Sequence, residues 1–458
     1  VKQIRDVMEP ISRMDGDSLP VSAFEGNVNG EWEQGASAYE KRGTAVMVPE
    51  WDAEKCIQCN QCAFVCSHAT IRPFCLTADE AANAPESTKL ADTKPKASEY
   101  KFTMAVSPLD CMGCGECVTV CPTKAIEMKP QESQAAQQAA FDYCVENIRK
   151  KDNIPGVVSE VSVKGSQFNQ PLLEFSGSCA GCAETSYARL ITQLFGEKMF
   201  ISNATGCSSI WGGTASISPY TTNKESGFGP AWINSLFEDN AEHGLGMQIG
   251  YETVRANLIT KVEALKGKNA DLDAVIDKYL ETKNNTKAVN VMVFDTEMYS
   301  NTGGQASKAS NIGEVCQFAA AGKEISKKSL AEICMTYGYI YVAQIALGAN
   351  MAQAVKAIAE AEAYPGPSII IGYAPCELHG VKGGMTNCQN EMKKAVEAGY
   401  WNLFTFNPAL KAEGKNPFTL TSKAGKMDKY QEFLANETRY SRLSRAFPDR
   451  AKALFEKS

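Results

Sequence analysis

The chain has 458 residues, of which 44% are hydrophobic and 22% are charged, and its formal net charge at neutral pH is −7. The length gives room for about two to four domains with cores of their own, and the composition is that of an ordinary globular protein. The negative charge, with no run of Lys or Arg, argues against nucleic-acid binding, and no apolar stretch is long enough to span a membrane.

Residues 1–50 contain Pro, Gly and acidic residues and few periodic apolar segments. This composition predicts an arm that wraps around the rest of the chain. The chain begins at Val1 rather than at Met, and we expect it to be part of a longer polypeptide.

Residues 51–130 contain two copies of one cysteine spacing, C-x2-C-x2-C-x3-C, and Pro122 follows the second copy. The spacing is typical of bacterial ferredoxins with two [4Fe–4S] clusters, in which the fourth cysteine of each copy ligates the cluster of the other. This rule predicts one cluster on Cys56, Cys59, Cys62 and Cys121, and another on Cys111, Cys114, Cys117 and Cys66. We therefore predict an α+β ferredoxin-like domain in which the polar residues 76–100 form an inserted loop.

Disulfide bonds and zinc explain the two cysteine ladders less well. Disulfides suit short secreted chains, whereas this chain is long and shows no signal peptide. Zinc takes four ligands per site, usually in two pairs with a longer gap, and leaves the duplication unexplained. Seventeen cysteines without an export signal indicate a reducing, anaerobic compartment, and we expect the cytoplasm.

Residues 131–405 alternate helix-like and strand-like segments. Helices are predicted over 132–150 and 351–364, and apolar runs predict strands over 199–203, 289–294, 339–346 and 368–373. This alternation predicts an α/β domain with an open parallel sheet that binds ligands at the carboxyl ends of its strands. The charged residues 406–458 predict a helical tail on the surface.

The predicted α/β domain holds a second, scattered set of cysteines: Cys179, Cys182, Cys207 and Cys376. By spacing alone, Cys179-Ala-Gly-Cys182 fits a redox dithiol, half of a zinc site, part of a third cluster, or no site at all. His379 follows closely, and it fits either a hydrogen-bond donor to such a cluster or a surface turn. Five cysteines have no ladder spacing: Cys75, Cys144, Cys316, Cys334 and Cys388.

Several runs of residues resemble pyruvate:ferredoxin oxidoreductases. The ladder Cys56-Ile-Gln-Cys-Asn-Gln-Cys-Ala-Phe-Val-Cys66 is one, and Lys164-Gly-Ser-Gln-Phe-Asn-Gln-Pro171 is another. The most specific is Asp295-Thr-Glu-Met-Tyr-Ser-Asn-Thr-Gly-Gly-Gln305. The resemblance covers about 15–405 and corresponds to the C-terminal part of that family's long chain, namely the ferredoxin domain and the domain that holds thiamine diphosphate.

The resemblance implies site residues, one position at a time. It places a third [4Fe–4S] cluster, next to the thiamine, on Cys179, Cys182, Cys207 and Cys376. It gives Mg²⁺ the hydroxyl of Thr296 and the backbone carbonyl of Met298, which suits a hard cation. It lines the thiamine diphosphate with Glu184, Cys207, Thr296, Glu297, Met298, Tyr299, Ser300 and Asn301, although Ala183 replaces the family's usual Gly.

The activity implied by the resemblance is the oxidative decarboxylation of a 2-oxoacid, foremost pyruvate, with coenzyme A to acyl-CoA and CO₂. Electrons would pass singly through three clusters to ferredoxin or flavodoxin. The same resemblance implies the remaining domains of the enzyme as partners and a homodimer. The alternative interpretation is an iron–sulfur electron-transfer module that has lost thiamine binding.

One motif of the family is missing from the sequence. Thiamine enzymes of this type carry Gly-Asp-Gly at a strand end, with the Asp as the remaining Mg²⁺ ligand, and these 458 residues contain none. Where the family places it, the sequence predicts an amphipathic helix (Val254, Leu258, Val262, Leu265) and then polar residues up to Thr286. Either the protein lacks that strand, or the sequence skips it. Loss of a central strand would expose unpaired backbone groups, which favours the second explanation and predicts a chain break at 284–289.

Overall fold

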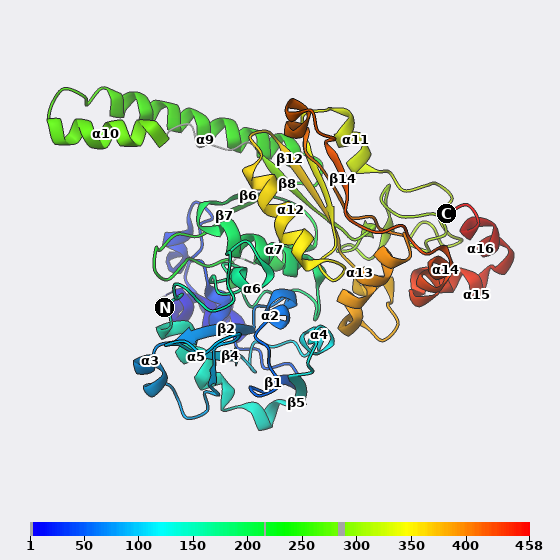
Figure 1. Cartoon of the computed structure of the whole chain (residues 1–458), viewed down its shortest axis with the longest axis horizontal. Coiled ribbons are helices and arrows are strands. Elements are labelled where there is room, and N and C mark those ends of the chain that lie inside the picture. The colour runs from blue at the N-terminus through cyan, green and yellow to red at the C-terminus, as the bar shows by residue number, and fades with distance from the viewer. Residues whose placement is uncertain (1–2, 215–216, 283–288) are drawn as a thin grey trace.

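The computed structural model describes residues 3–214, 217–282 and 289–458, so the predicted break at 284–289 falls largely outside the described residues. Figure 1 shows two bodies side by side, a ferredoxin-like unit and an α/β unit, with a helical hairpin that projects from the second. None of the described helices is both long and apolar enough to cross a membrane.

The ferredoxin-like unit combines short strands and short helices. Strand β1 (Met47–Trp51) pairs antiparallel with β5 (Ile126–Pro130), and β4 (Lys101–Val106) pairs with both β2 (Ile71–Leu76) and β3 (Ala91–Asp92). Helices α2 (Gln61–Val65) and α4 (Glu116–Thr119) begin inside the two cysteine ladders. The inserted segment 76–100 is partly regular, because α3 (Ala78–Ala82) and β3 lie in it. A core built around Trp51, Ile71, Phe102 and Ile126 holds these pieces together.

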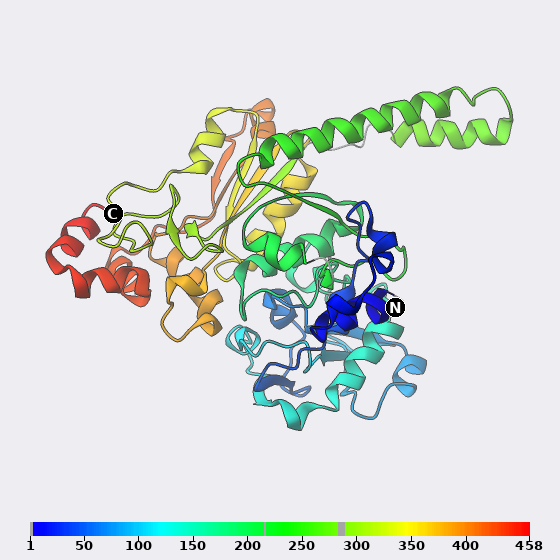
Figure 2. The ribbon, with the colours of Figure 1, turned by 180° about the vertical axis from the view of Figure 1, so that it is seen from behind.

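The N-terminal arm has only short helical segments: Ile4–Met8, Glu9–Ser12 (α1), Gly16–Ser18, Val21–Asn27 and Ala36–Tyr39. Figure 2 shows it on the back of the molecule, against both units. The backbone N–H of Gly35 donates to Tyr220 O and that of Ser37 donates to Ser218 O. These bonds attach the arm to the α/β unit shortly before the chain enters β1 of the ferredoxin-like unit.

The main sheet of the α/β unit is mixed rather than parallel. Its five strands run in the order β14 (Phe418–Leu420), β13 (Phe404–Phe406), β11 (Tyr341–Ile345), β12 (Ser368–Tyr373) and β8 (Asn290–Asp295). Only β11, β12 and β8 are parallel, while β13 and β14 are antiparallel. The predicted parallel arrangement holds for β8, β11 and β12, but it is wrong for β13 and β14. These two strands have three residues each, which is too short to leave a periodic signal in the sequence.

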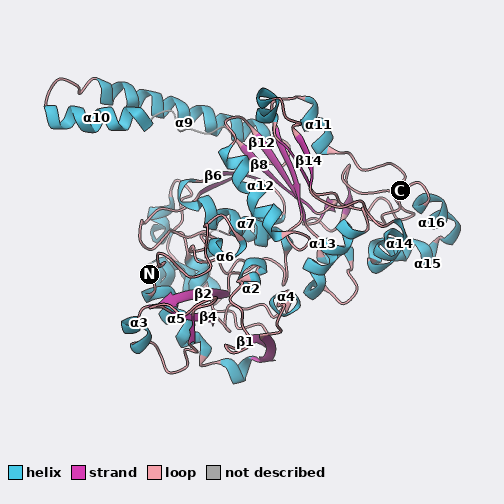
Figure 3. Ribbon diagram, in the orientation of Figure 1, coloured by secondary structure: helices cyan, strands magenta, loops and turns pink. Residues whose placement is uncertain are grey.

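Helices α7 (Ala183–Phe195), α11 (Leu330–Thr336) and α12 (Met351–Ala363) pack against this sheet (Figure 3). A second, separate sheet contains only β6 (Phe200–Ala204) and β7 (Ala231–Ser235), which are parallel. Helices α5 (Gln137–Asn147), α6 (Val163–Ser166) and α8 (Cys207–Gly212), and the two-residue strands β9 (Met298–Tyr299) and β10 (Gln305–Ala306), complete this region.

The predicted amphipathic helix forms part of α9 (Asn240–Glu263), which with α10 (Ala270–Thr282) makes the projecting hairpin of Figure 1. Its apolar stripe is not buried: Val254 is 69% exposed and Leu258 is 50% exposed. The helix was predicted correctly from its periodicity, but the described residues place no core against that stripe.

The C-terminal region differs from the predicted surface tail. Residues 406–458 first supply β14 to the sheet and then form α14 (Met427–Asn436), α15 (Thr438–Ala446) and α16 (Pro448–Phe455), near α13 (Cys388–Glu397). Arg439, Tyr440 and Leu443 of α15 are buried. The high charge of the segment hid these inward-facing residues, and two of the partners of Arg439, Glu297 and Glu314, lie more than a hundred positions away along the chain.

Arg189 of α7 joins the two units. This buried side chain donates to the backbone carbonyl oxygens of Cys66 (2.8 Å) and Phe64, both within the first ladder. Ser186, one turn earlier, donates to Val65 O at 2.8 Å. The helix that follows Cys182 is thereby fixed to the loop that ends at Cys66, so the two cysteine sets have a defined relative position.

Candidate functional site: two ligand loops and a cavity beside a cysteine set

Both ladders use the same backbone device to turn their cysteines inward. Gln58 and Asn60 flank Cys59 with φ of 60° and 61°, and Gly113 and Gly115 flank Cys114 with φ of 68° and 80°. These values lie in the left-handed region that glycine adopts without strain. The first loop uses larger residues, and their side chains hold it: Gln58 Nε2 donates to Asp92 O at 2.7 Å, and Asn60 Nδ2 donates to Lys164 O at 3.0 Å.

Backbone N–H groups point at the thiols in both ladders. Gln58 N lies 3.3 Å from Cys56 Sγ and Gly113 N lies 3.4 Å from Cys111 Sγ, at equivalent positions of the two copies. Ala125 N lies 3.1 Å from Cys121 Sγ, and Thr70 N lies 3.4 Å from Cys66 Sγ. Such donors stabilise thiolates that ligate metal and tune the potential of an iron–sulfur cluster.

The structure brings the fourth cysteine of each ladder to the other ladder. Burial raises the pKa of the Cys59 thiol, and the neighbouring Cys56 and Cys121 add to the effect. Burial likewise raises the pKa of Cys111 to about 11, and here the added cysteine is Cys66. Thiols gathered from both ladders in a buried site suit a cluster whose iron ions offset much of the negative charge of the thiolate ligands.

The crossed arrangement predicts how serine variants should group. Cys121→Ser should alter the same EPR signal of the reduced protein as Cys56→Ser, and Cys66→Ser the same signal as Cys111→Ser. Cys334→Ser, on α11 and outside both ladders, should leave both signals intact. A spectrum in which Cys66→Ser and Cys56→Ser affect one cluster would show that each ladder binds its own.

The second cysteine set meets at the start of α7 and α8. Burial raises the pKa of Cys207 to about 12, and Glu184, Cys376 and Cys179 contribute. Cys182 immediately precedes α7, and its backbone N–H donates to Cys179 O at 3.1 Å. Among the described residues, no three His, Cys, Asp or Glu side chains converge closely enough to bind a single metal ion. This is compatible with a cluster, because the four thiols around a four-iron cube lie farther apart than the ligands of one ion.

Cys388, to which the sequence spacing assigned no site, lies between the second ladder and the Cys179–Cys182 turn. Burial raises its pKa well above the usual value, and Glu116, Cys182 and Cys114 add to the effect. Glu116 is a buried carboxyl group inside the second ladder, and Gln389 Nε2 is 3.5 Å from its Oε1. The second ladder is therefore the one that faces the Cys179–Cys182 turn. No signal in the sequence could have shown this.

The loop that follows β8, residues 295–304, places its polar groups toward the second cysteine set. Thr296 Oγ1 donates to Met298 O at 3.0 Å, and Ser300 Oγ donates to Thr296 Oγ1 at 2.9 Å. The side chains of Asn301 and Ser300 reach the thiols of Cys207 and Cys376, respectively. Thr296 and Met298, the two predicted Mg²⁺ ligands, thus converge at the carboxyl end of a parallel strand.

The 3.0 Å between Thr296 Oγ1 and Met298 O fits two adjacent ligands of Mg²⁺. An octahedral ion with ligands at about 2.1 Å spaces neighbouring oxygens by about 3.0 Å. Glu184 is half-buried close by, desolvation raises its pKa, and Trp211 Nε1 donates to its Oε2 at 3.1 Å. The donor set fits a hard cation with a diphosphate, and the carboxyl group of Glu184 lies beside it.

Glu297 departs from the prediction. Its side chain is 1% exposed and turns away from the cavity that its neighbours line. Lys327 and Arg439 hold the pKa of this carboxyl at about 2, although burial alone would raise it. His379 is buried rather than on a surface turn, and its Nε2 lies 2.8 Å from Thr296 O. Arg439, Lys327 and His379 are residues near the site whose roles sequence reasoning did not identify.

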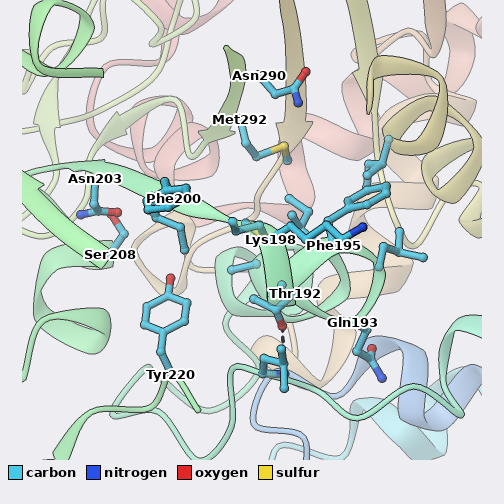
Figure 4. A pocket seen from close by; sticks show the side chains of 18 of the residues that line it. Thr192, Gln193, Phe195, Lys198, Phe200, Asn203, Ser208, Tyr220, Asn290 and Met292 are labelled. Carbon is cyan, nitrogen blue, oxygen red and sulfur yellow. Dashed lines mark hydrogen bonds between the residues drawn. The ribbon is translucent and has the colours of Figure 1, made fainter. Parts of the chain in front are cut away.

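A cavity of about 2470 Å³ opens between β8 and β6. Glu184, Cys207, Thr296, Met298, Ser300 and Asn301 line one end of it, and Tyr299 and the apolar side chains of β8 and α7 continue along it. Figure 4 shows Met292 of β8, Thr192 of α7 and Phe200 of β6 around the same space. The volume is more than twice the about 1,000 Å³ of a large ligand pocket.

The fold and these sites define the class of the protein: an iron–sulfur protein in which a dicluster ferredoxin domain is joined to an α/β unit. A family described as a 4Fe-4S dicluster domain matches residues 55–125, and a family described as a domain of unknown function matches residues 2–45.

Curated relatives extend the comparison to nearly the whole chain. A pyruvate-flavodoxin oxidoreductase of Enterobacter agglomerans is 45% identical over 99% of this chain and 44% of its own length. A pyruvate:ferredoxin oxidoreductase of Moorella thermoacetica is 44% identical with the same coverage of both chains. A solved structure of a 2-oxoglutarate:ferredoxin oxidoreductase from Magnetococcus marinus covers 50% of this chain and 69% of its own, with 16% identity and a TM-score of 0.30. The chain is homologous throughout to part of the pyruvate:ferredoxin and pyruvate-flavodoxin oxidoreductases, which confirms the resemblance, and it spans less than half the length of these two relatives.

The alignment with the Enterobacter agglomerans protein runs over 528 positions, which 458 residues cannot fill, so at least 70 positions have no counterpart in this chain. In the structure, the strands that the described residues form leave one side of β8 unpaired, and Val291 is 45% exposed there.

Proposed function

We propose that this chain is the electron-transfer and thiamine-binding part of a 2-oxoacid oxidoreductase that acts on pyruvate, with coenzyme A and a ferredoxin or flavodoxin as co-substrates. The observation that carries the proposal is the 295–304 loop, which meets Cys207 and Glu184 at the cavity and reaches Cys376 through Ser300. The two ladders and relatives that are about 45% identical support it.

In this proposal thiamine diphosphate supplies the carbanion chemistry that releases CO₂, and iron–sulfur clusters accept the two resulting electrons one at a time. Thr296 and Met298 would hold Mg²⁺ through oxygen, and Asn301 would approach the diphosphate. The ladder thiols and the second cysteine set would bind three clusters, with backbone N–H groups directed at the sulfurs. The half-buried carboxyl of Glu184 would lie against the cofactor.

The Enterobacter agglomerans relative contains at least 70 aligned positions that this chain lacks. We also propose that, in the complete protein, some of these positions form a strand that pairs with the open side of β8. The cavity runs along the unpaired side of β8, and the family's Gly-Asp-Gly loop follows a strand at this point of the chain. That strand would supply the remaining Mg²⁺ ligand. The alternative, an electron-transfer module without thiamine, is favoured by one observation: the sequence itself contains no Gly-Asp-Gly.

The test uses the product of the complete reading frame, purified without oxygen. It should reduce ferredoxin when pyruvate, coenzyme A, Mg²⁺ and thiamine diphosphate are all present, and omission of any one should stop the reaction. If dithionite-reduced protein passes electrons to ferredoxin but pyruvate never does, the electron-transfer module is the correct interpretation.

A further inference from the structure

A cluster of buried charges lies behind the 295–304 loop, on the side away from the cavity. Its centre is Glu297, which sits between the two proposed Mg²⁺ ligands and has a φ of 61°. A residue with a side chain is held in this left-handed conformation only when its surroundings fix it. The contacts of Glu297 therefore decide where Thr296 and Met298 lie.

Groups from four distant segments hold the Glu297 carboxylate. Tyr400 Oη donates at 2.6 Å and Asn311 Nδ2 at 2.8 Å, while Lys327 Nζ and Arg439 Nη2 form ion pairs at 3.3 Å and 2.8 Å. Arg439 is the member that comes from the C-terminal helices, in α15.

Arg439 also neutralises two other buried carboxylates. Its Nε lies 2.7 Å from Glu437 Oε2 and its Nη1 lies 3.4 Å from Glu314 Oε1. Glu437 in turn lies 3.7 Å from Nδ1 of His379, whose other nitrogen faces Thr296 O. Without Arg439, the basic side chains described near these acids would be Lys327, Lys323 and His379. Loss of one partner from a buried charge set is strongly unfavourable, since it leaves unpaired charge in a medium of low polarity.

We propose that Arg439 is a positioning residue that acts through Glu297: the C-terminal helices hold the 295–304 loop in the conformation that presents Thr296 and Met298 to Mg²⁺. The inference rests on the proposed function for its cofactor, but the geometry concerns only residues of this chain. The C-terminal region is thus part of the cofactor site without touching the cofactor.

The experiment compares the product of the complete reading frame, with its clusters, as wild type, Arg439→Met, Arg439→Lys and Arg445→Met. Arg445 is an exposed residue of the same helix and serves as the control. Hydrogen exchange of residues 295–304 is measured without thiamine diphosphate, and iron content is measured alongside. Arg439→Met should speed exchange of the loop by about tenfold or more, Arg439→Lys by less, and Arg445→Met not at all. Iron should stay unchanged in all four proteins.

A second measurement adds Mg²⁺ and thiamine diphosphate. Arg439→Met should weaken Mg²⁺-dependent binding by about 10- to 100-fold, the usual cost of removing a residue that orients a metal ligand. If wild type binds no cofactor, the proposed function fails at this step, while loop exchange still decides the role of Arg439. Unchanged loop exchange in Arg439→Met overturns the inference.

The pathway through Glu297 is tested with Glu297→Gln and the Glu297→Gln/Arg439→Met double variant. If Arg439 acts through Glu297, hydrogen exchange of residues 295–304 should be no faster in the double variant than in the more affected of the two single variants. Effects that multiply would overturn the route through Glu297. Should Arg439→Met not fold, Tyr400→Phe removes one hydroxyl donor to the same carboxylate and should speed loop exchange in a folded protein; no change there would count against the inference.

Discussion

Replacing Cys207 with alanine should lower the iron content of protein prepared without oxygen from about twelve to about eight atoms per chain. Cys207 begins α8, and the nearby charges of Cys376 and Cys179 act on its thiol. A four-iron cube left with three thiolate ligands loses one iron–sulfur bond to the protein and should not be retained. The two ladder clusters should keep their EPR signals, because the ladders use none of these residues.

Cys334→Ala is the control for this loss, because Cys334 lies on α11, away from both cysteine sets, and should retain about twelve iron atoms. Iron and sulfide are measured chemically on the same samples. Twelve iron atoms in Cys207→Ala would show that Cys207 is not a ligand. Eight in the wild type would show that the second cysteine set holds no cluster.

Thr296→Ala should weaken Mg²⁺-dependent binding of thiamine diphosphate by about 100-fold, as measured by calorimetry without oxygen. The change removes a hydroxyl that lies 3.0 Å from Met298 O and receives a hydrogen bond from Ser300. A hard cation has a strong preference for such oxygens, and a methyl group cannot replace them. The iron content should not change, since the hydrogen bonds of this hydroxyl go to Met298 O and Ser300 Oγ and not directly to a thiol.

Two matched variants make the result specific. Thr296→Ser keeps the hydroxyl and should retain most of the affinity. Thr336→Ala removes an exposed hydroxyl on α11 and should have no effect. Equal affinity of Thr296→Ala and wild type would remove Thr296 from the metal site, and a parallel loss of iron would point to a folding defect instead.

The sequence predicted the local parts of the structure well. Fixed cysteine spacing predicted the dicluster domain, because the ligand loops are short and their geometry is set within eleven residues of chain. Apolar runs located β8, β11 and β12 within one or two residues. The thiamine diphosphate residues carried over from the family line one cavity, except Glu297, whereas Cys179, Cys182 and Cys376 are not among its lining residues; the roles of all of them remain predictions.

What could not be predicted depends on contacts between distant segments. Strands β13 and β14 are too short for a periodic signal, so the sheet was expected to be parallel throughout. Glu297 was assigned to the cofactor by its place in a motif, but Arg439, Tyr400 and Lys327 draw its carboxylate to the opposite side. Charge alone classed residues 406–458 as surface, although the partners of Arg439 are buried acids.

The open side of β8 has a consequence for handling the protein. Asn290–Asp295 is an apolar strand with one row of backbone N–H and C=O groups unpaired among the described strands, and such an edge is a template for any other extended chain. A protein in which no strand covers this side of β8 should therefore associate with itself through β8 as its concentration rises. A charged residue in place of Val291 would act as a gatekeeper against that association.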